Sequence, residues 1–140
     1  MPFESFDHTA DVGVDVWAPT LTELFAEAAR ALTTVLCDLD TLRATEARRT
    51  EVTAPDLERL LVEWLEELLT WFDVDQWLAC SARVSVTGGP GAWRLSAVVD
   101  GERFDADRHR LNVLVKAVTY HALSVTKSED GWRARIVFDI

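Results

Sequence analysis

Apolar residues near the start of the chain recur first at every second position and then at the spacing of a helix. The alternating residues, which predict a strand, are Val12, Val14 and Val16. The helically spaced residues, which predict an amphipathic helix opened by Pro19 and Thr20, are Leu24, Phe25, Ala28, Ala31, Leu32, Val35 and Leu36. The run Asp-Leu-Asp at 38–40 is expected to end this helix, and residues 41–47 to form a polar connection.

A second and stronger helical pattern follows a short strand expected over residues 48–53. Thr53 is the expected N-cap of this helix, with Pro55 in its first turn. The apolar face consists of Leu57, Leu60, Leu61, Trp64, Leu65, Leu68, Leu69 and Phe72. The opposite face carries Glu58, Glu63, Glu66 and Glu67. Large apolar residues at this spacing indicate a helix that packs on a core rather than a cofactor site.

The second half of the chain contains mainly strand patterns. Alternating residues over 82–86 and 93–99 flank a glycine-rich turn at 88–91, and they predict an antiparallel pair. This turn lacks the lysine-containing frame of a phosphate-binding loop. Asp100 and Gly101 indicate a further hairpin turn.

The remaining residues predict a polar loop over 104–112, a short helix and a terminal hairpin. The short helix is predicted from the spacing of Leu114, Ala117, Val118 and His121, although Thr119 and Tyr120 also suit a strand. The hairpin is expected to pair residues 124–127 with 132–139. The resulting order, β-α-β-α-β-β-α-β-β, predicts an α+β fold. We expect one domain over residues 1–140, with a largely antiparallel sheet and two main helices packed on one face.

The acidic composition limits the classes of function. The 140 residues carry a formal net charge of −10, from 24 Asp and Glu against 14 Lys and Arg. The first 70 residues account for the whole excess, with 15 acidic and 5 basic residues. Stable binding to nucleic acid or to an anionic membrane surface uses an excess of Lys and Arg. We therefore expect neither from this protein on its own.

Cysteine usage and the absence of long apolar runs point to a cytoplasmic protein. Cys37 and Cys80 form neither a disulfide framework nor a zinc motif, so we expect free, buried thiols in a reducing compartment. No basic-then-apolar leader opens the sequence, and no apolar run approaches the ~18 residues of a membrane span.

Two places bring carboxylates close enough together to hold a metal ion. The first is the run Asp-His-Thr-Ala-Asp at 7–11, although composition alone favours a solvated turn there. The second is the C-terminus, where a hydrophobic strand places Asp139 beside the terminal carboxylate of Ile140. Two such anions repel unless a cation neutralises them. The simplest candidates for that neutralisation are Arg133 and Arg135 in the same strand.

Other polar residues carry weaker indications of chemistry. Asp105, Asp107 and His109 lack the glycine and distal glutamate of a calcium loop, so an exposed loop is the simpler interpretation. Lys116 is one of only two lysines, which hints at a required point charge, although a surface lysine is the ordinary case. His121 is expected to be a core histidine on the apolar side of its helix. No nucleophile stands in a diagnostic catalytic frame.

Four segments spread along the chain together resemble the archease family. They are His-Thr-Ala-Asp-Val-Gly at 8–13, Leu-Val-Glu-Trp-Leu-Glu-Glu-Leu-Leu at 61–69, Val-Lys-Ala-Val-Thr-Tyr-His at 115–121, and Val-Phe-Asp-Ile at 137–140. The resemblance implies a small α+β protein that assists an RtcB-type RNA-splicing ligase. In that family the accessory protein promotes guanylylation of the active-site histidine of the ligase and its multiple turnover, in tRNA splicing and RNA repair.

The resemblance also implies a divalent cation held by Asp11, Asp139 and Ile140. Carboxylate and carbonyl oxygens are hard ligands, so we expect Ca²⁺, with Mg²⁺ or Mn²⁺ as alternatives. Such a site requires the first predicted strand to lie beside the last one. Four further residues are expected to support the site: His8, Asp38, Lys116 and His121.

These observations lead to one main functional hypothesis and two alternatives. The main hypothesis is a non-enzymatic activator that docks its acidic surface on the basic active-site mouth of an RtcB-type RNA ligase. One alternative is a chaperone-like partner of an RNA-modifying enzyme, such as a tRNA methyltransferase. The other is a stand-alone metal-dependent hydrolase that uses the same carboxylates, with His8 or His121 as the base.

Overall fold

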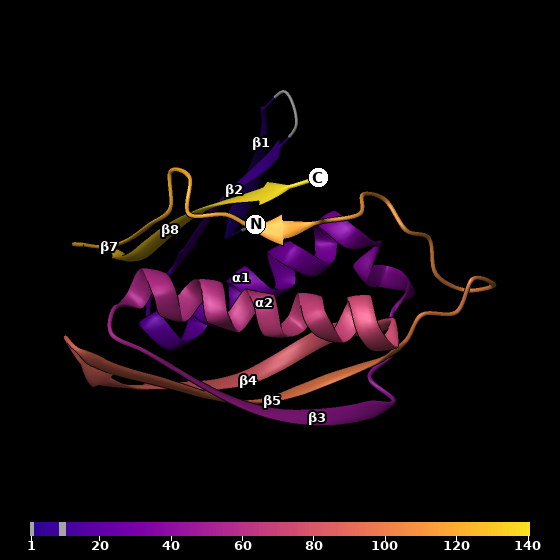
Figure 1. Cartoon of the computed structure of the whole chain (residues 1–140), viewed down its shortest axis with the longest axis horizontal. Helices are drawn as coiled ribbons and strands as arrows, with labels where there is room; N and C mark the ends of the chain where they lie inside the picture. The colour runs from indigo at the N-terminus through magenta and orange to yellow at the C-terminus, as the bar shows by residue number, and fades with distance from the viewer. Residues whose placement is uncertain (1, 9–10) are drawn as a thin grey trace.

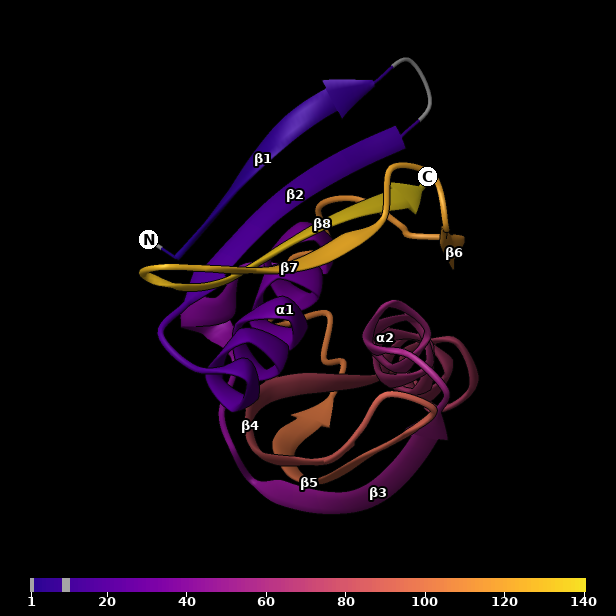
Figure 2. The same ribbon diagram turned by 90° about the vertical axis from the view of Figure 1, so that its left-hand side faces the viewer.

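The computed structural model describes residues 2–8 and 11–140, with side chains for 2–5 and 11–140, and arranges their strands in two antiparallel sheets. The five-stranded sheet contains β1 (Phe3–His8), β2 (Asp11–Ala18), β6 (Ala117–Val118), β7 (Ser124–Ser128) and β8 (Gly131–Asp139). The three-stranded sheet contains β3 (Glu46–Ala54), β4 (Trp77–Gly89) and β5 (Ala92–Arg103). Two helices, α1 (Leu21–Leu36) and α2 (Leu57–Asp75), lie between the sheets, and a short 3₁₀ turn, η1 (Leu39–Thr41), follows α1 (Figures 1 and 2).

The helices begin where side-chain oxygens can cap their free N–H groups. The Thr20 hydroxyl accepts a hydrogen bond from the backbone N–H of Glu23 at 3.2 Å and opens α1, as predicted. For α2 the predicted cap is wrong, because Thr53 still belongs to β3. The carboxylate of Asp56 accepts from the N–H of Arg59 at 2.8 Å instead. In the described residues, neither helix is long and apolar enough to cross a lipid bilayer.

The hydrophobic core fills the space between the two sheets, where side chains from both sheets pack against both helices. Trp64 of α2 is completely buried, and its indole N–H donates to the carbonyl of Phe25 in α1 at 2.9 Å. Ile136 and Leu95 contribute from the two sheets and are also fully buried. Burying a side chain of this size stabilises the fold by roughly 1.5–3 kcal/mol. The predicted α+β class with two main helices is confirmed, and the strands are divided so that the helices cover one face of each sheet.

The segment expected to form a third helix is instead mostly irregular and contains the two-residue strand β6. The N–H of Thr119 donates to the carbonyl of Val137 in β8 at 3.0 Å, and the N–H of Val118 donates to Glu66 of α2 at 3.2 Å. These partners satisfy the backbone without a helix, so tertiary contacts override the local spacing.

Two further predictions about strands need correction. Residues 3–8 form a strand, β1, that the sequence analysis did not predict. Gly101 lies inside β5 rather than in a turn, and a Cβ placed on it would lie 2.1 Å from the carbonyl oxygen of Leu78. The glycine is needed there for the close approach of β4, not for a reversal of the chain.

Candidate metal-binding site

The residues proposed to hold a cation meet at one end of the five-stranded sheet, where β2 begins and β8 ends, and we call this end the acidic edge. The antiparallel register of β2 and β8 pairs Asp11 directly with Asp139, as the sequence hypothesis requires. On the other side of Asp139 the register continues to Ala117 in β6. Directly opposed residues in an antiparallel pair have Cβ atoms about 4.5–5.5 Å apart and point to the same face. Ile140 follows Asp139, so the C-terminal carboxylate lies at the same edge, close to the start of β2 (Figure 2).

The arginines suggested as neutralising partners are engaged elsewhere along the strand. Arg135 forms a two-point ion pair with Asp15, at 2.7 and 2.8 Å, and this hydrogen bonding lowers the pKa of the Asp15 carboxyl. The guanidinium carbon of Arg133 lies 5.6 Å from the ring centroid of Trp17. Among the described side chains, no Lys or Arg forms an ion pair with the two opposed aspartates.

The donor set at this edge fits a hard divalent cation. Asp11 and Asp139 are both half-buried and offer carboxylate oxygens, as does the end of the chain. Oxygen donors of this kind suit Ca²⁺, Mg²⁺ or Mn²⁺ rather than a softer metal. The described part of the chain contains no group of three or more His, Cys, Asp and Glu side chains arranged for a metal. Ile140, which follows Asp139, brings the end of the chain beside the two aspartates.

Of the predicted supporting residues, the structure brings Lys116 to this edge. Its backbone N–H donates to the carbonyl of Asp139 at 2.7 Å, and its side chain is exposed. His121 is exposed at a turn, so the expectation of a core histidine is wrong, because the helix that would have buried it does not form. The side chain of His8 lies outside the described residues, although its backbone pairs with Asp11 in the hairpin of β1 and β2.

Asp38 serves a different part of the molecule. Its carboxylate accepts from the side-chain amide of Asn112 at 3.0 Å, and the N–H of Asn112 donates to the carbonyl of Leu36 at 2.8 Å. These bonds fasten the long connection between β5 and β6 to the end of α1. We assign Asp38 to that connection rather than to the opposed aspartates.

A buried polar cluster that the sequence analysis missed is centred on Glu102. This residue is only 4% exposed and accepts from the N–H of Arg43 at 2.6 Å and from the guanidinium of Arg108. The hydrogen bonds from Arg108 are the main reason why its pKa falls to about 2. The N–H of Asp105 donates to Nδ1 of His109, whose Nε2 lies 2.9 Å from Glu102 and therefore carries the proton. The expectation of an exposed histidine at 109 is thus wrong, because Glu102 satisfies it in the interior.

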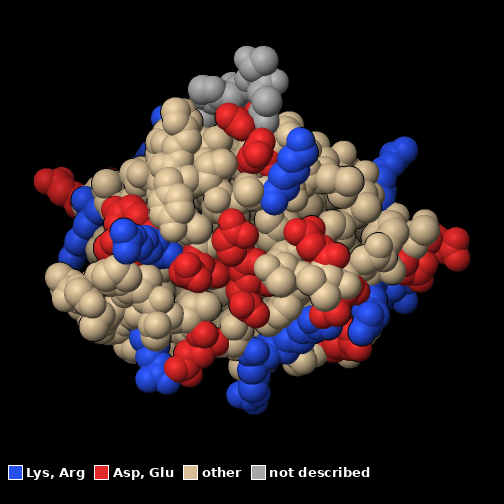
Figure 3. All heavy atoms as spheres, in the orientation of Figure 1, with Lys and Arg blue, Asp and Glu red and all other residues tan. Residues whose placement is uncertain are grey.

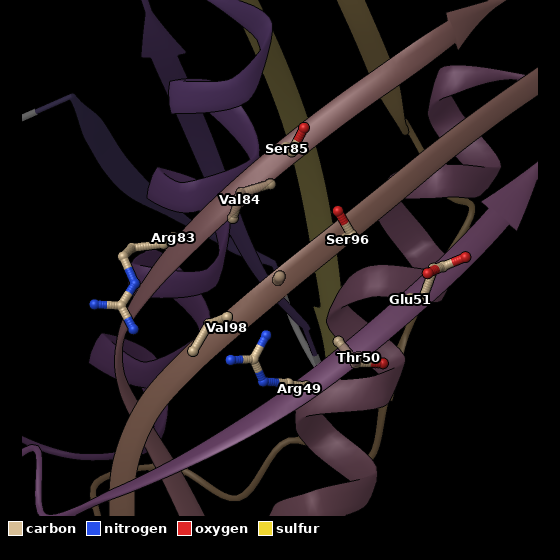
Figure 4. Close-up of a pocket in the computed structure, with 9 residues that line it drawn as sticks. Arg49, Thr50, Glu51, Arg83, Val84, Ser85, Ser96 and Val98 are labelled. Carbon is tan, nitrogen blue, oxygen red and sulfur yellow. The ribbon is translucent and has the colours of Figure 1, made fainter.

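A broad surface hollow lies on the other sheet. It has a volume of about 640 Å³ and covers the outer face of β3, β4 and β5 (Figure 4). Arg49 of β3 and Arg83 of β4 are both paired with Val98 of β5. Two residues further along the strands, Ser85 is paired with Ser96. The hollow is open and belongs to a different sheet from the opposed aspartates, so it forms no part of the candidate metal site.

The architecture defines a small two-sheet α+β protein, in which β2 and β8 bring two aspartates face to face beside the end of the chain. The model of the Archease protein family (MTH1598/TM1083) matches residues 3–140, and the chain belongs to that family. The relative named Protein archease from Methanosarcina acetivorans is 39% identical over 139 residues, which cover 99% of this chain and 95% of the relative. The relative of the same name from Methanopyrus kandleri is 38% identical over 140 residues, which cover all of both chains.

A solved structure supports the same assignment at the level of the fold. The solution structure of Methanobacterium thermoautotrophicum protein 1598 matches with a TM-score of 0.84 and 32% identity, over 99% of both chains. The family resemblance found in the four sequence segments is therefore confirmed over the whole chain.

Proposed function

We propose that this protein is a non-enzymatic accessory factor that activates an RtcB-type RNA ligase. It would promote guanylylation of the ligase and its multiple turnover, and its divalent cation would be held by Asp11, Asp139 and the terminal carboxylate of Ile140. The observation that supports this proposal is the pairing of Asp11 with Asp139 beside the end of the chain, away from the arginines of the same strand. The family membership supports the accessory role.

Backbone pairing in the sheet would hold the proposed cation ligands in position. The register of β2 and β8 holds the two carboxylates together, and β6 supports Asp139 through the N–H of Lys116 at 2.7 Å. A bound cation would supply positive charge opposite phosphate oxygens, with Ca²⁺ expected and Mg²⁺ or Mn²⁺ as alternatives.

The acidic surface supports a basic protein partner. Acidic side chains gather over the middle of the face where α2 lies, and Lys and Arg are placed mainly around them (Figures 1 and 3). The exposed side chain of Glu63 and the half-buried side chains of Glu66 and Glu67 contribute to this surface from α2. A ligase that handles GTP, metal and RNA is expected to have a basic active-site mouth, so complementary charge would steer docking. Activation should then fall as the salt concentration rises.

A guanylylation assay of the cognate ligase with GTP tests the proposal. We expect the wild-type protein to accelerate guanylylation, and Asp11→Asn or Asp139→Asn to reduce that acceleration at least tenfold while leaving the fold intact by circular dichroism. Asp107→Asn is the matched control, because Asp107 is an exposed aspartate in the loop after β5. A C-terminal extension by a few residues should impair both cation binding and activation, since it removes the terminal carboxylate from Ile140.

The outcomes separate the competing functions. Wild-type-like activation by both aspartate variants would overturn the role of the cation, and absence of any effect of the wild-type protein would overturn the accessory role. Turnover of GTP without ligase, lost in Asp11→Asn, would support a stand-alone hydrolase. Prevention of aggregation of a tRNA methyltransferase, with no effect on the ligase, would support the chaperone-like role.

A further inference from the structure

The short strand β6 lies between the acidic edge and α2. It is an edge strand of the five-stranded sheet, and its register pairs Ala117 with Asp139 and Val118 with Phe138 of β8. Figures 1 and 2 both show β6 between the end of β8 and α2. Any displacement of β6 therefore acts directly on the backbone of Asp139.

Pairing with β8 gives a strand of this length little stability. β6 has only two residues, whereas strands in globular proteins usually have about 3–10. Just before it, the N–H of Lys116 donates to the carbonyl of Asp139 at 2.7 Å, and just after it the N–H of Thr119 donates to the carbonyl of Val137 at 3.0 Å. So short a ladder needs support from outside the sheet to stay in place.

Glu66 of α2 supplies such support. Its Oε1 accepts a hydrogen bond from the backbone N–H of Val118 at 3.2 Å, so this N–H is paired with a helix and not with a strand. Hydrogen bonds to a charged acceptor are stronger than those between neutral groups. The helix is a rigid base for this bond, because Trp64 and Leu65, which precede Glu66, are completely buried in the core.

Asp139 is sensitive to this support because it stands at the end of both of its strand pairings. Its pair with Asp11 is the terminal pair of β2 and β8, and its pair with Ala117 is the terminal pair of β6 and β8. The ends of strands open more readily than their centres. Without β6, Asp139 would be held on one side only, opposite a residue of like charge.

We propose that Glu66 is a positioning residue for the acidic edge. It holds β6 in place, and β6 holds the backbone of Asp139 beside Asp11. Among the described side chains, no three of His, Cys, Asp and Glu are arranged for a metal, so Glu66 acts as a hydrogen-bond acceptor and not as a third carboxylate ligand. The consequence for cation binding rests on the site proposed above.

Amide hydrogen exchange, followed by NMR in a chelator, measures whether Glu66 holds β6. Glu66→Ala removes the acceptor, and we expect the amides of Lys116 and Thr119, whose own partners in β8 remain, to exchange at least about tenfold faster. Glu66→Gln keeps an oxygen acceptor and should stay within about threefold of the wild type. The amide of Ile136, in the middle of β8, should be unchanged. Glu63→Ala, which removes an exposed acid from the same helix, is the matched control and should change none of these rates.

Calorimetric titration with Ca²⁺ measures the consequence for the proposed cation site. Residues that orient metal ligands without touching the metal typically contribute about 10–100-fold to its affinity. We therefore expect Glu66→Ala to raise the Kd for Ca²⁺ at least about tenfold, whereas Glu66→Gln and Glu63→Ala should stay within about threefold of the wild type.

The other outcomes overturn the positioning role in different ways. Unchanged exchange of Lys116 and Thr119 in Glu66→Ala would show that β6 does not depend on Glu66. Faster exchange that includes Ile136 would show a general loss of stability in place of local positioning. An equal rise in the Kd for Ca²⁺ in Glu66→Ala and Glu66→Gln, with normal exchange in Glu66→Gln, would show that only the charge matters. If the wild type itself does not bind Ca²⁺, the proposed cation site fails, and the exchange rates alone decide whether Glu66 positions the edge.

Discussion

Because two aspartates oppose each other, we predict that Asp139→Asn stabilises the protein in the absence of Ca²⁺ and makes it less stable than the wild type when Ca²⁺ is added. In the metal-free protein, Asp11 and Asp139 face each other across β2 and β8. Two unit charges about 5 Å apart repel by roughly 0.8 kcal/mol in water, and like charges opposed on a sheet destabilise it by about 0.2–1 kcal/mol. Asp139→Asn removes this repulsion and keeps the shape of the side chain. We expect it to raise the free energy of unfolding by about 0.5–1 kcal/mol in a chelator.

Saturation with Ca²⁺ should reverse the order of stability. A ligand that binds only the folded state stabilises it by about 2.7 kcal/mol when its concentration is one hundred times the Kd. If the proposed site binds Ca²⁺, the wild-type protein should gain this stabilisation, whereas Asp139→Asn, which lacks one of the charged oxygen donors, should gain much less. The wild type should therefore become the more stable protein by about 2 kcal/mol in saturating Ca²⁺.

Urea denaturation followed by tryptophan fluorescence measures both quantities, since the chain has 6 tryptophans. Each variant is unfolded once in a chelator and once in excess Ca²⁺, with Asp107→Asn as the control that should match the wild type in both. The reasoning is refuted if Asp139→Asn is clearly less stable than the wild type in the chelator. It is also refuted if Ca²⁺ stabilises the variant and the wild type equally.

Three further predictions concern the rest of the fold. Glu102→Gln should lower the free energy of unfolding by on the order of 3 kcal/mol at pH 7, because the pKa of Glu102 falls to about 2 in the folded protein. The stabilisation from the ionised carboxylate is present above about pH 5 and is lost as the pH falls toward 2. The free energies of unfolding of the wild type and the variant, measured in urea, should therefore converge near pH 2. Gly101→Ala should destabilise the protein by at least ~2 kcal/mol in the same assay, since the added Cβ would lie 2.1 Å from the carbonyl oxygen of Leu78. Burial raises the pKa of the Cys37 thiol to about 11, so at pH 8 it should react with a disulfide reagent at least ~100-fold more slowly than free cysteine, and equal rates would contradict this.

The sequence determined those elements whose stability is decided by neighbours a few residues away. The apolar stripes of α1 and α2 and the hairpin of β7 and β8 follow the periods predicted for them. Their caps are also local, although the predicted cap of α2, Thr53, is wrong, because β3 continues to Ala54 and Asp56 caps the helix. Local periodicity suffices here because each element buries one continuous face.

Distant partners decided the segments whose local pattern is ambiguous. Ala117 and Val118 suit a helix by spacing, yet the free edge of β8 and the carboxylate of Glu66 hold them as a strand. His109 lies in a polar stretch, yet it is buried, because Glu102 and the N–H of Asp105 form hydrogen bonds with its two ring nitrogens. In both cases a hydrogen-bond partner outside the segment replaces the local preference.

The candidate site shows the same division between local and distant information. Asp11 and Asp139 are selected through the resemblance to the archease family, and the crowding of Asp139 with the end of the chain agrees with that choice. Their pairing depends on the register of β2 and β8, which join opposite ends of the sequence. The positions of Arg133 and Arg135 also became clear only in the sheet, where Trp17 and Asp15 engage them. Register is set by the buried faces of both strands together, since a shift of one residue would expose their apolar side chains, and no single segment contains that information.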